Sequence, residues 1–65
     1  MINLNRLKGL RVENGFTQKE MAKKINMPEA TYQKKESGET QFLLIEADKI
    51  AKVFQKDIKD IFFTN

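Results

Sequence analysis

The polar residues whose types and spacing best suit recognition lie in the segment 28–37, PEATYQKKES. A helix turns by about 100° per residue, so a helix over this segment would gather small or polar side chains on one face. That face holds Ala30, Gln33, Lys34 and Ser37. This composition is compatible with a surface that enters a DNA groove, and it is equally compatible with an ordinary solvated face.

Each candidate side chain matches a different base edge. Lys34 could reach O6 and N7 of guanine or a phosphate, and the donor and acceptor of Gln33 suit adenine. Ala30 could contact a thymine methyl group, and Glu29 could accept a hydrogen bond from cytosine N4. The segment therefore predicts four base-reading positions.

Other kinds of chemistry find little support in the chain. Its 65 residues contain no cysteine and no histidine, which removes disulfides, thiolate sites and the commonest general base. Nothing resembles a phosphate-binding loop or a metal-ligand spacing. We therefore expect no enzyme, no cofactor, no metal and no small-molecule ligand.

The charge is divided unevenly along the chain. Residues 1–35 hold eight Lys and Arg against three Asp and Glu, a balance of +5, and residues 36–65 hold four against six, a balance of −2. A basic front half suits a protein that meets a polyanion with one side, and an uneven scatter of lysines over a helical protein explains it equally well. No apolar run approaches the roughly 20 residues of a membrane span, and the start MINLNRLKGL is too short and too polar for a signal peptide. These features favour a cytoplasmic protein without a membrane partner.

Helical spacing recurs along the chain, and strand signals are weak. Asn3 can cap a first helix that stops at Asn14-Gly15, and Thr17 can cap a second helix with Glu20 as its capping-box partner. Asn26 tolerates the left-handed conformation between the second helix and a third over about 28–37. A fourth helix and a short fifth, over 58–63, complete the pattern. The apolar positions of the first, second and fourth helices are Leu4, Leu7, Leu10, Met21, Ala22, Ile25, Leu44, Ala47, Ile50, Ala51 and Phe54.

The expected fold is thus all-α, a compact five-helix bundle forming one domain over residues 1–65. Its second and third helices, with the turn at 26–28, form a helix-turn-helix at about 18–37. Three segments carry a family resemblance: LKGLRVENGFTQKEMAKKI, TYQKKESGE and IEADKIAKVFQKDIKDIFF. With these segments the chain resembles the lambda-repressor-like, Cro/XRE-type DNA-binding domains.

This resemblance implies that the third helix lies in the major groove of operator DNA, with Glu29, Ala30 and Lys34 at base-reading positions. It also implies that Gln18 holds the DNA backbone and that Arg11 and Glu36 form a structural ion pair between the first and third helices. The full set of predicted phosphate contacts is Thr17, Gln18, Lys19, Ser37 and Thr40, and Thr17 could instead be a plain helix cap. At the position of Lys35 the family is usually apolar, so we expect the lysine stem along the core and its ammonium in solvent.

Two functions follow. The first is a sequence-specific transcriptional regulator, a repressor of phage or mobile-element type, acting at the bacterial nucleoid. The second is a protein-interaction module on the same fold, an antitoxin or an anti-repressor, in which the apolar C-terminal end would matter more than the third helix. Leu43, Ile45, Ile58 and Phe63 are candidates for an exposed patch.

The resemblance also favours a weak homodimer through the C-terminal helix. The residues assigned to it are Ile58, Ile61, Phe62 and Phe63. Alternatively, Ile61 and Phe62 belong to the core and Phe63 is an isolated surface ring.

Overall fold

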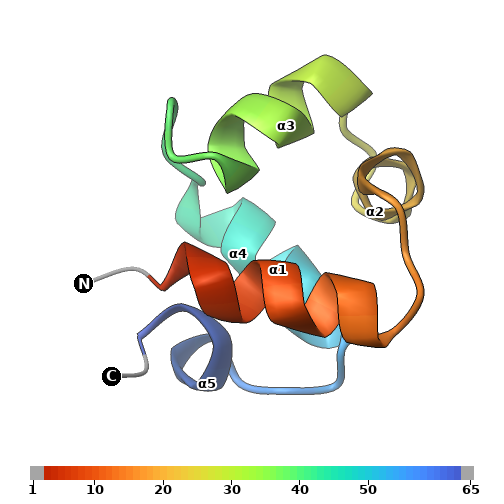
Figure 1. Cartoon of the computed structure of the whole chain (residues 1–65). Coiled ribbons are helices and arrows are strands. Elements are labelled where there is room, and N and C mark those ends of the chain that lie inside the picture. The colour runs from red at the N-terminus through yellow and green to blue at the C-terminus, as the bar shows by residue number, and fades with distance from the viewer. Residues whose placement is uncertain (1–2, 64–65) are drawn as a thin grey trace.

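All regular structure in the computed structural model, which describes residues 3–63, is helical. The helices are α1 Leu4–Glu13, α2 Gln18–Lys24, α3 Glu29–Glu36, α4 Leu44–Val53 and α5 Ile58–Phe62. In Figure 1, α1 crosses the middle of the molecule, α3 lies above it and α5 lies below it. The predicted five-helix, all-α fold is confirmed.

The helix ends follow from local chemistry. Asn3 Oδ1 accepts a hydrogen bond from Arg6 N at 3.0 Å and so caps α1. The chain leaves α1 through Gly15 at φ 76° and leaves α3 through Gly38 at φ 87°, conformations that a glycine adopts without strain. Gln55, between α4 and α5, also has a positive φ of 55°, which the sequence pattern did not predict.

The core lies between all five helices. Its buried side chains are Leu7, Leu10, Met21, Ala22, Ile25, Tyr32, Ala47, Ile50, Ala51, Ile61 and Phe62. Phe42 connects two of them, because its ring makes edge contacts with Tyr32 and Phe62 at centroid distances of 5.9 and 5.7 Å. This row of rings holds α3 to the C-terminal end of the domain.

Two expectations about the core need correction. Leu44, which was expected on the apolar side of the fourth helix, is 73% exposed. It stands in the first turn of α4 beside an open hollow, so no helix covers it. Ile61 and Phe62, which one alternative assigned to a dimer surface, are buried in the core as the other alternative expected. Of the four residues assigned to the dimer, Ile58 is half-buried and Phe63, just after α5, is exposed.

The domain is small. Its principal extents are 27 × 23 × 19 Å, and its longest helices have ten residues. Within residues 3–63, no helix is long and apolar enough to cross a membrane.

Candidate nucleic-acid interface

The predicted helix-turn-helix is formed by α2, a short turn and α3. In Figure 1, α2 is seen end-on while α3 runs across the view, so the two helices cross steeply. Asn26 takes the left-handed conformation at φ 58°, as its residue type predicted, and Met27 N donates to Ala22 O at 2.9 Å to close the turn. Pro28 then enters α3 at φ −59°, which its ring already favours.

A reciprocal capping box fixes the start of α2. Thr17 Oγ1 accepts from Glu20 N at 3.0 Å, and Glu20 Oε1 accepts from Thr17 N at 2.9 Å. The hydrogen bond from the Thr17 backbone lowers the pKa of Glu20, so this carboxylate is charged at neutral pH. The predicted capping box is present, and Thr17 acts as the helix cap, which was one of the two roles expected for it.

The inner face of α3 carries a buried carboxylate. Glu36 is 1% exposed and accepts from Arg11 Nε at 2.9 Å, Arg11 Nη2 at 3.1 Å, Gln18 Nε2 at 3.0 Å and Tyr32 Oη at 2.6 Å. Arg11 Nη1 also donates to Phe16 O at 2.8 Å. One carboxylate therefore holds α1, α2 and α3 together.

Burial and hydrogen bonding act in opposite directions on this group. Burial alone would raise the pKa of Glu36, but the hydrogen bonds from Arg11, Tyr32 and Gln18 outweigh it, and the pKa is lowered. Burial and the bond to the Glu36 carboxylate raise the pKa of Tyr32, so its hydroxyl remains a donor. The Glu36 carboxylate is therefore charged at neutral pH, and every buried side-chain polar atom within residues 3–63 has a hydrogen-bond partner.

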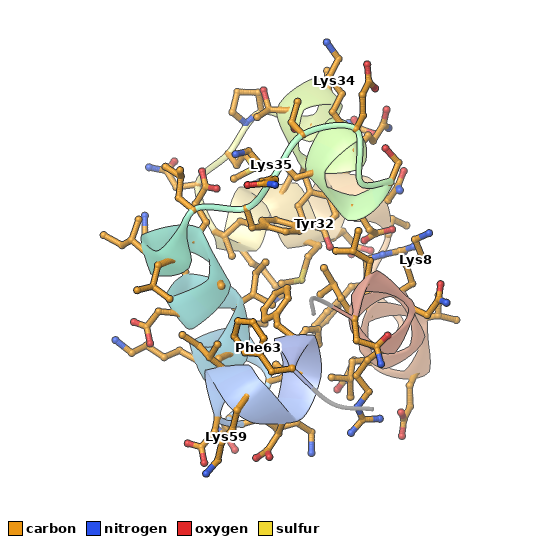
Figure 2. All side chains as sticks on the ribbon, turned by 90° about the vertical axis from the view of Figure 1, so that its left-hand side faces the viewer. Lys8, Tyr32, Lys34, Lys35, Lys59 and Phe63 are labelled. Carbon is orange, nitrogen blue, oxygen red and sulfur yellow. The ribbon has the colours of Figure 1, made fainter. Side chains whose placement is uncertain are left out.

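The outer face of α3 is open to solvent. Glu29, Ala30, Gln33 and Lys34 are all exposed, and Figure 2 shows Lys34 pointing away from the body of the molecule. Gln33 Nε2 donates to Glu29 Oε2 at 3.0 Å, one turn earlier in the helix. Within residues 3–63, Lys34 forms no ion pair and its ammonium makes no hydrogen bond. The four predicted base-reading residues thus share one accessible face.

The five predicted phosphate contacts differ in their engagement. Thr17 and Gln18 already bond within the protein, and the hydroxyl of Ser37 donates to Lys34 O at 2.9 Å. Lys19 and Thr40 are exposed at the two ends of the motif. Lys19 borders an open hollow of about 450 Å³ along the turn between α2 and α3.

Lys35 departs from expectation. Its side chain is 12% exposed, and Nζ lies 2.9 Å from Glu46 Oε1 and donates to Gln41 O at 2.9 Å, so the ammonium is paired and not in solvent. Glu46 Oε1 also accepts from Leu43 N at 2.8 Å at the start of α4. Two helices are therefore joined through one carboxylate oxygen.

Sequence reasoning missed several of these contacts. The pairs Tyr32–Glu36 and Glu29–Gln33 stand four residues apart on a helix, a spacing that brings side chains together and could have indicated both. The bonds Gln18–Glu36 and Lys35–Glu46 join separate helices, and no local spacing signals them.

Comparison with known proteins agrees with this geometry. A family model described as helix-turn-helix matches residues 7–61, most of the chain. No curated protein sequence matches the chain. The match spans the capping box, the turn, α3 and the helices that support them. The chain belongs to the Cro/XRE-type helix-turn-helix family of DNA-binding regulators.

Proposed function

We propose that this DNA-binding domain is a sequence-specific repressor of phage or mobile-element type, which places α3 in the major groove of an operator. It would act in the bacterial cytoplasm, at the nucleoid that contains its operator. Repression is the simplest consequence of a compact domain occupying a promoter.

The open outer face of α3 carries the proposal. An eight-residue helix is about 12 Å long, and a helix with its side chains is about as wide as the major groove of B-DNA. Every buried side-chain polar atom within residues 3–63 has a hydrogen-bond partner, so the inner face needs nothing further. On the outer face, the ammonium of Lys34 has no partner within residues 3–63, and a base would supply one.

The proposed roles on this face follow from donor and acceptor chemistry. Lys34 offers donors alone and suits guanine, and Ala30 suits a thymine methyl group. Lys19 and Thr40 are the most available phosphate contacts, since neither side chain is held elsewhere in the described chain. Gln18 keeps one amide N–H beyond the one that it gives to Glu36.

A weak homodimer remains part of the proposal, on a smaller surface. Phe63 is 52% exposed, and with Ile58, Leu43 and Leu44 it lines a hollow of about 140 Å³. Pairing two copies there would link two α3 helices, each able to occupy one of two neighbouring half-sites, and binding at the second half-site would become intramolecular.

The same apolar surface also favours a second candidate, a protein-interaction module such as an antitoxin or an anti-repressor. Leu43, Leu44 and Ile45 are each at least 60% exposed. In that case another protein would cover these residues, and α3 would not need to read bases.

A gel shift with genomic fragments and a salt titration tests the proposal. Specific binding requires at least one fragment to be bound far more tightly than random DNA, with an affinity that falls steeply as salt increases. A reporter placed behind the bound promoter should lose expression when the protein is supplied. Absence of any shift, together with a stoichiometric protein partner, would favour the second candidate.

A further inference from the structure

The outer face of α3 contains one internal hydrogen bond, between Gln33 and Glu29. Gln33 Nε2 lies 3.0 Å from Glu29 Oε2, and both side chains are exposed. A carboxylate only accepts hydrogen bonds, so it must face the nitrogen of the amide and not its oxygen. Glu29 therefore selects one of the two orientations that the Gln33 amide could take.

The selected orientation leaves a defined edge for a ligand. The amide nitrogen has two hydrogens, and one of them is used by Glu29. When Glu29 takes the hydrogen that lies trans to Oε1, the other hydrogen and Oε1 itself stay available side by side. A donor beside an acceptor is the complement of the N7 and N6 edge of adenine in the major groove.

We propose that Glu29 and Gln33 act as one specificity unit that selects adenine, with Glu29 as the positioning residue and Gln33 as the contact. This inference rests on the proposed DNA-binding role of α3. An unrestrained glutamine could turn its whole NH2 group toward a guanine, which shows two acceptors, whereas the bond to Glu29 makes that choice costly. A charged acceptor also strengthens the amide as a hydrogen-bonding group.

The placement of a carboxylate on this face supports the unit. A negative charge near DNA repels phosphates and weakens binding to every sequence. Glu29 lies in the first turn of α3 and stabilises the helix through its dipole, but that role needs no bond to Gln33. A carboxylate that increases specificity and lowers general affinity accounts both for its place on this face and for its bond to Gln33.

The test measures base preference and not affinity alone. An operator is first selected from a random DNA pool, and the base pair read by Gln33 is found as the position where Gln33→Ala loses discrimination. At that position the wild-type protein should prefer adenine by about tenfold or more. Glu29→Ala should abolish most of this preference although Gln33 is still present, and should raise affinity for random DNA by roughly twofold or more. The double variant should discriminate no worse than either single variant.

Glu39→Ala is the matched control, because it removes the same charge from an exposed position just after α3. It should raise general affinity and leave the adenine preference unchanged. Thermal unfolding of each variant shows whether the domain is intact.

Two results would overturn the inference while leaving the proposed function standing. In one, Glu29→Ala binds the selected operator with unaltered base preference. In the other, the losses caused by Glu29→Ala and Gln33→Ala simply add. If the wild-type protein selects no sequence at all, the proposed function fails and this inference fails with it.

Discussion

Two adjacent lysines on α3 have opposite environments. Lys34 extends outward from the helix, and Lys35 packs inward along the loop that leads to α4, as Figure 2 shows for the two labelled side chains. A step of about 100° on a helix is enough to separate a solvent-facing position from a half-buried one. The first lysine is free to bind a ligand, whereas the second is a structural residue.

Replacing Lys34 by alanine should weaken operator binding by about 1–3 kcal/mol and relax base preference at one position. The side chain has no structural partner within residues 3–63, so stability should be unchanged. Binding to a panel of single-base operator variants measures the effect. An equal loss on all sequences would instead identify Lys34 as a phosphate contact.

Replacing Lys35 by alanine should show the reverse pattern. The bonds of its ammonium to Glu46 and to the Gln41 carbonyl would be lost, and we expect unfolding to become easier by about 1–2 kcal/mol. Base preference should remain that of the wild type. Urea unfolding and the same operator panel provide the two measurements, and a change in base preference would contradict the assignment.

The sequence was sufficient to place Lys34 but not Lys35. Helical periodicity alone assigns a side chain to a face, which is why Ala30, Gln33 and Lys34 could be grouped from their spacing. The partner of Lys35 stands 11 positions further along the chain, on another helix, and only the tertiary fold brings it near.

At the scale of helices, the Glu36 network determines how α3 is presented. Its donors come from α1, α2 and α3 itself. A charged group without access to water is held only while its partners are in place. The angle between α2 and α3 is therefore tied to the body of the domain.

Changing Glu36 to glutamine should lower the free energy of unfolding by about 3–5 kcal/mol, because the Arg11 guanidinium would lose its counter-charge in a half-buried site. A small domain has little more stability than this, so the variant should be partly unfolded at room temperature. Circular dichroism and urea titration report the change. Glu13→Gln, at an exposed position of α1, is the control and should differ from wild type by no more than about 0.5 kcal/mol.

Acid should destabilise the domain. Burial tends to raise the pKa of both Glu36 and Glu46, but hydrogen bonds from Arg11 to the first and from Leu43 and Lys35 to the second outweigh it, so both values are lowered. A carboxyl with a lowered folded-state pKa stabilises the fold above its unfolded pKa of about 4.3, and that stability is lost as pH falls through the folded value.

The free energy of unfolding should thus be nearly flat around neutral pH and decline below about pH 4.5. Urea titrations between pH 7 and pH 3 measure it. Glu46→Gln removes one of the responsible groups and should show a shallower decline. A domain that becomes more stable in acid would contradict this account.

The connection between α4 and α5 contains a residue in an unfavourable conformation. Gln55 has φ 55°, and a residue with a Cβ atom in the left-handed region costs about 1–2 kcal/mol more than glycine. Gln55→Gly should stabilise the domain by up to about 1 kcal/mol after the greater freedom of glycine in the unfolded chain is counted. Gln55→Ala keeps the Cβ atom and should bring no gain. Thermal unfolding of both variants decides whether the strain is real.

Local signals predicted most helix ends, because caps depend on neighbouring residues. Asn3, Thr17, Asn26 and Gly38 each behave as their residue types indicate. Gln55 escaped prediction since nothing in its type favours a positive φ. It stands where α4 ends, and Lys56 N donates to Ala51 O at 3.0 Å there, the hydrogen bond of a helix that ends on a left-handed residue. Likewise, Leu44 fits an apolar stripe on α4 but lies where no neighbouring helix reaches.

At the scale of the molecule, the outer face of α3, which we propose reads the groove, and the apolar surface lie apart. Figure 1 places α3 and α5 at opposite ends, and Figure 2 shows Lys34 at one end and Phe63 toward the other. The basic half of the chain contributes α1, α2 and α3, and the acidic half contributes α4 and α5. A partner bound at the apolar surface would therefore leave α3 free to meet DNA.

This arrangement allows a decisive test of the proposed homodimer. Leu44→Asp puts a charge into the hollow that Phe63 and Ile58 also line, whereas Val12→Asp alters a comparably exposed apolar residue on α1. Sedimentation should show the wild type and Val12→Asp approaching a dimer as concentration rises, while Leu44→Asp stays a monomer.

On DNA, Leu44→Asp should bind one half-site as tightly as wild type but lose about tenfold or more in affinity for paired half-sites, because the second contact is no longer linked to the first. If the wild type remains a monomer at millimolar concentration and binds paired sites no better than Leu44→Asp does, the dimer proposal is wrong. In that case α3 would bind a single site, with an affinity that comes only from its own contacts with bases and phosphates.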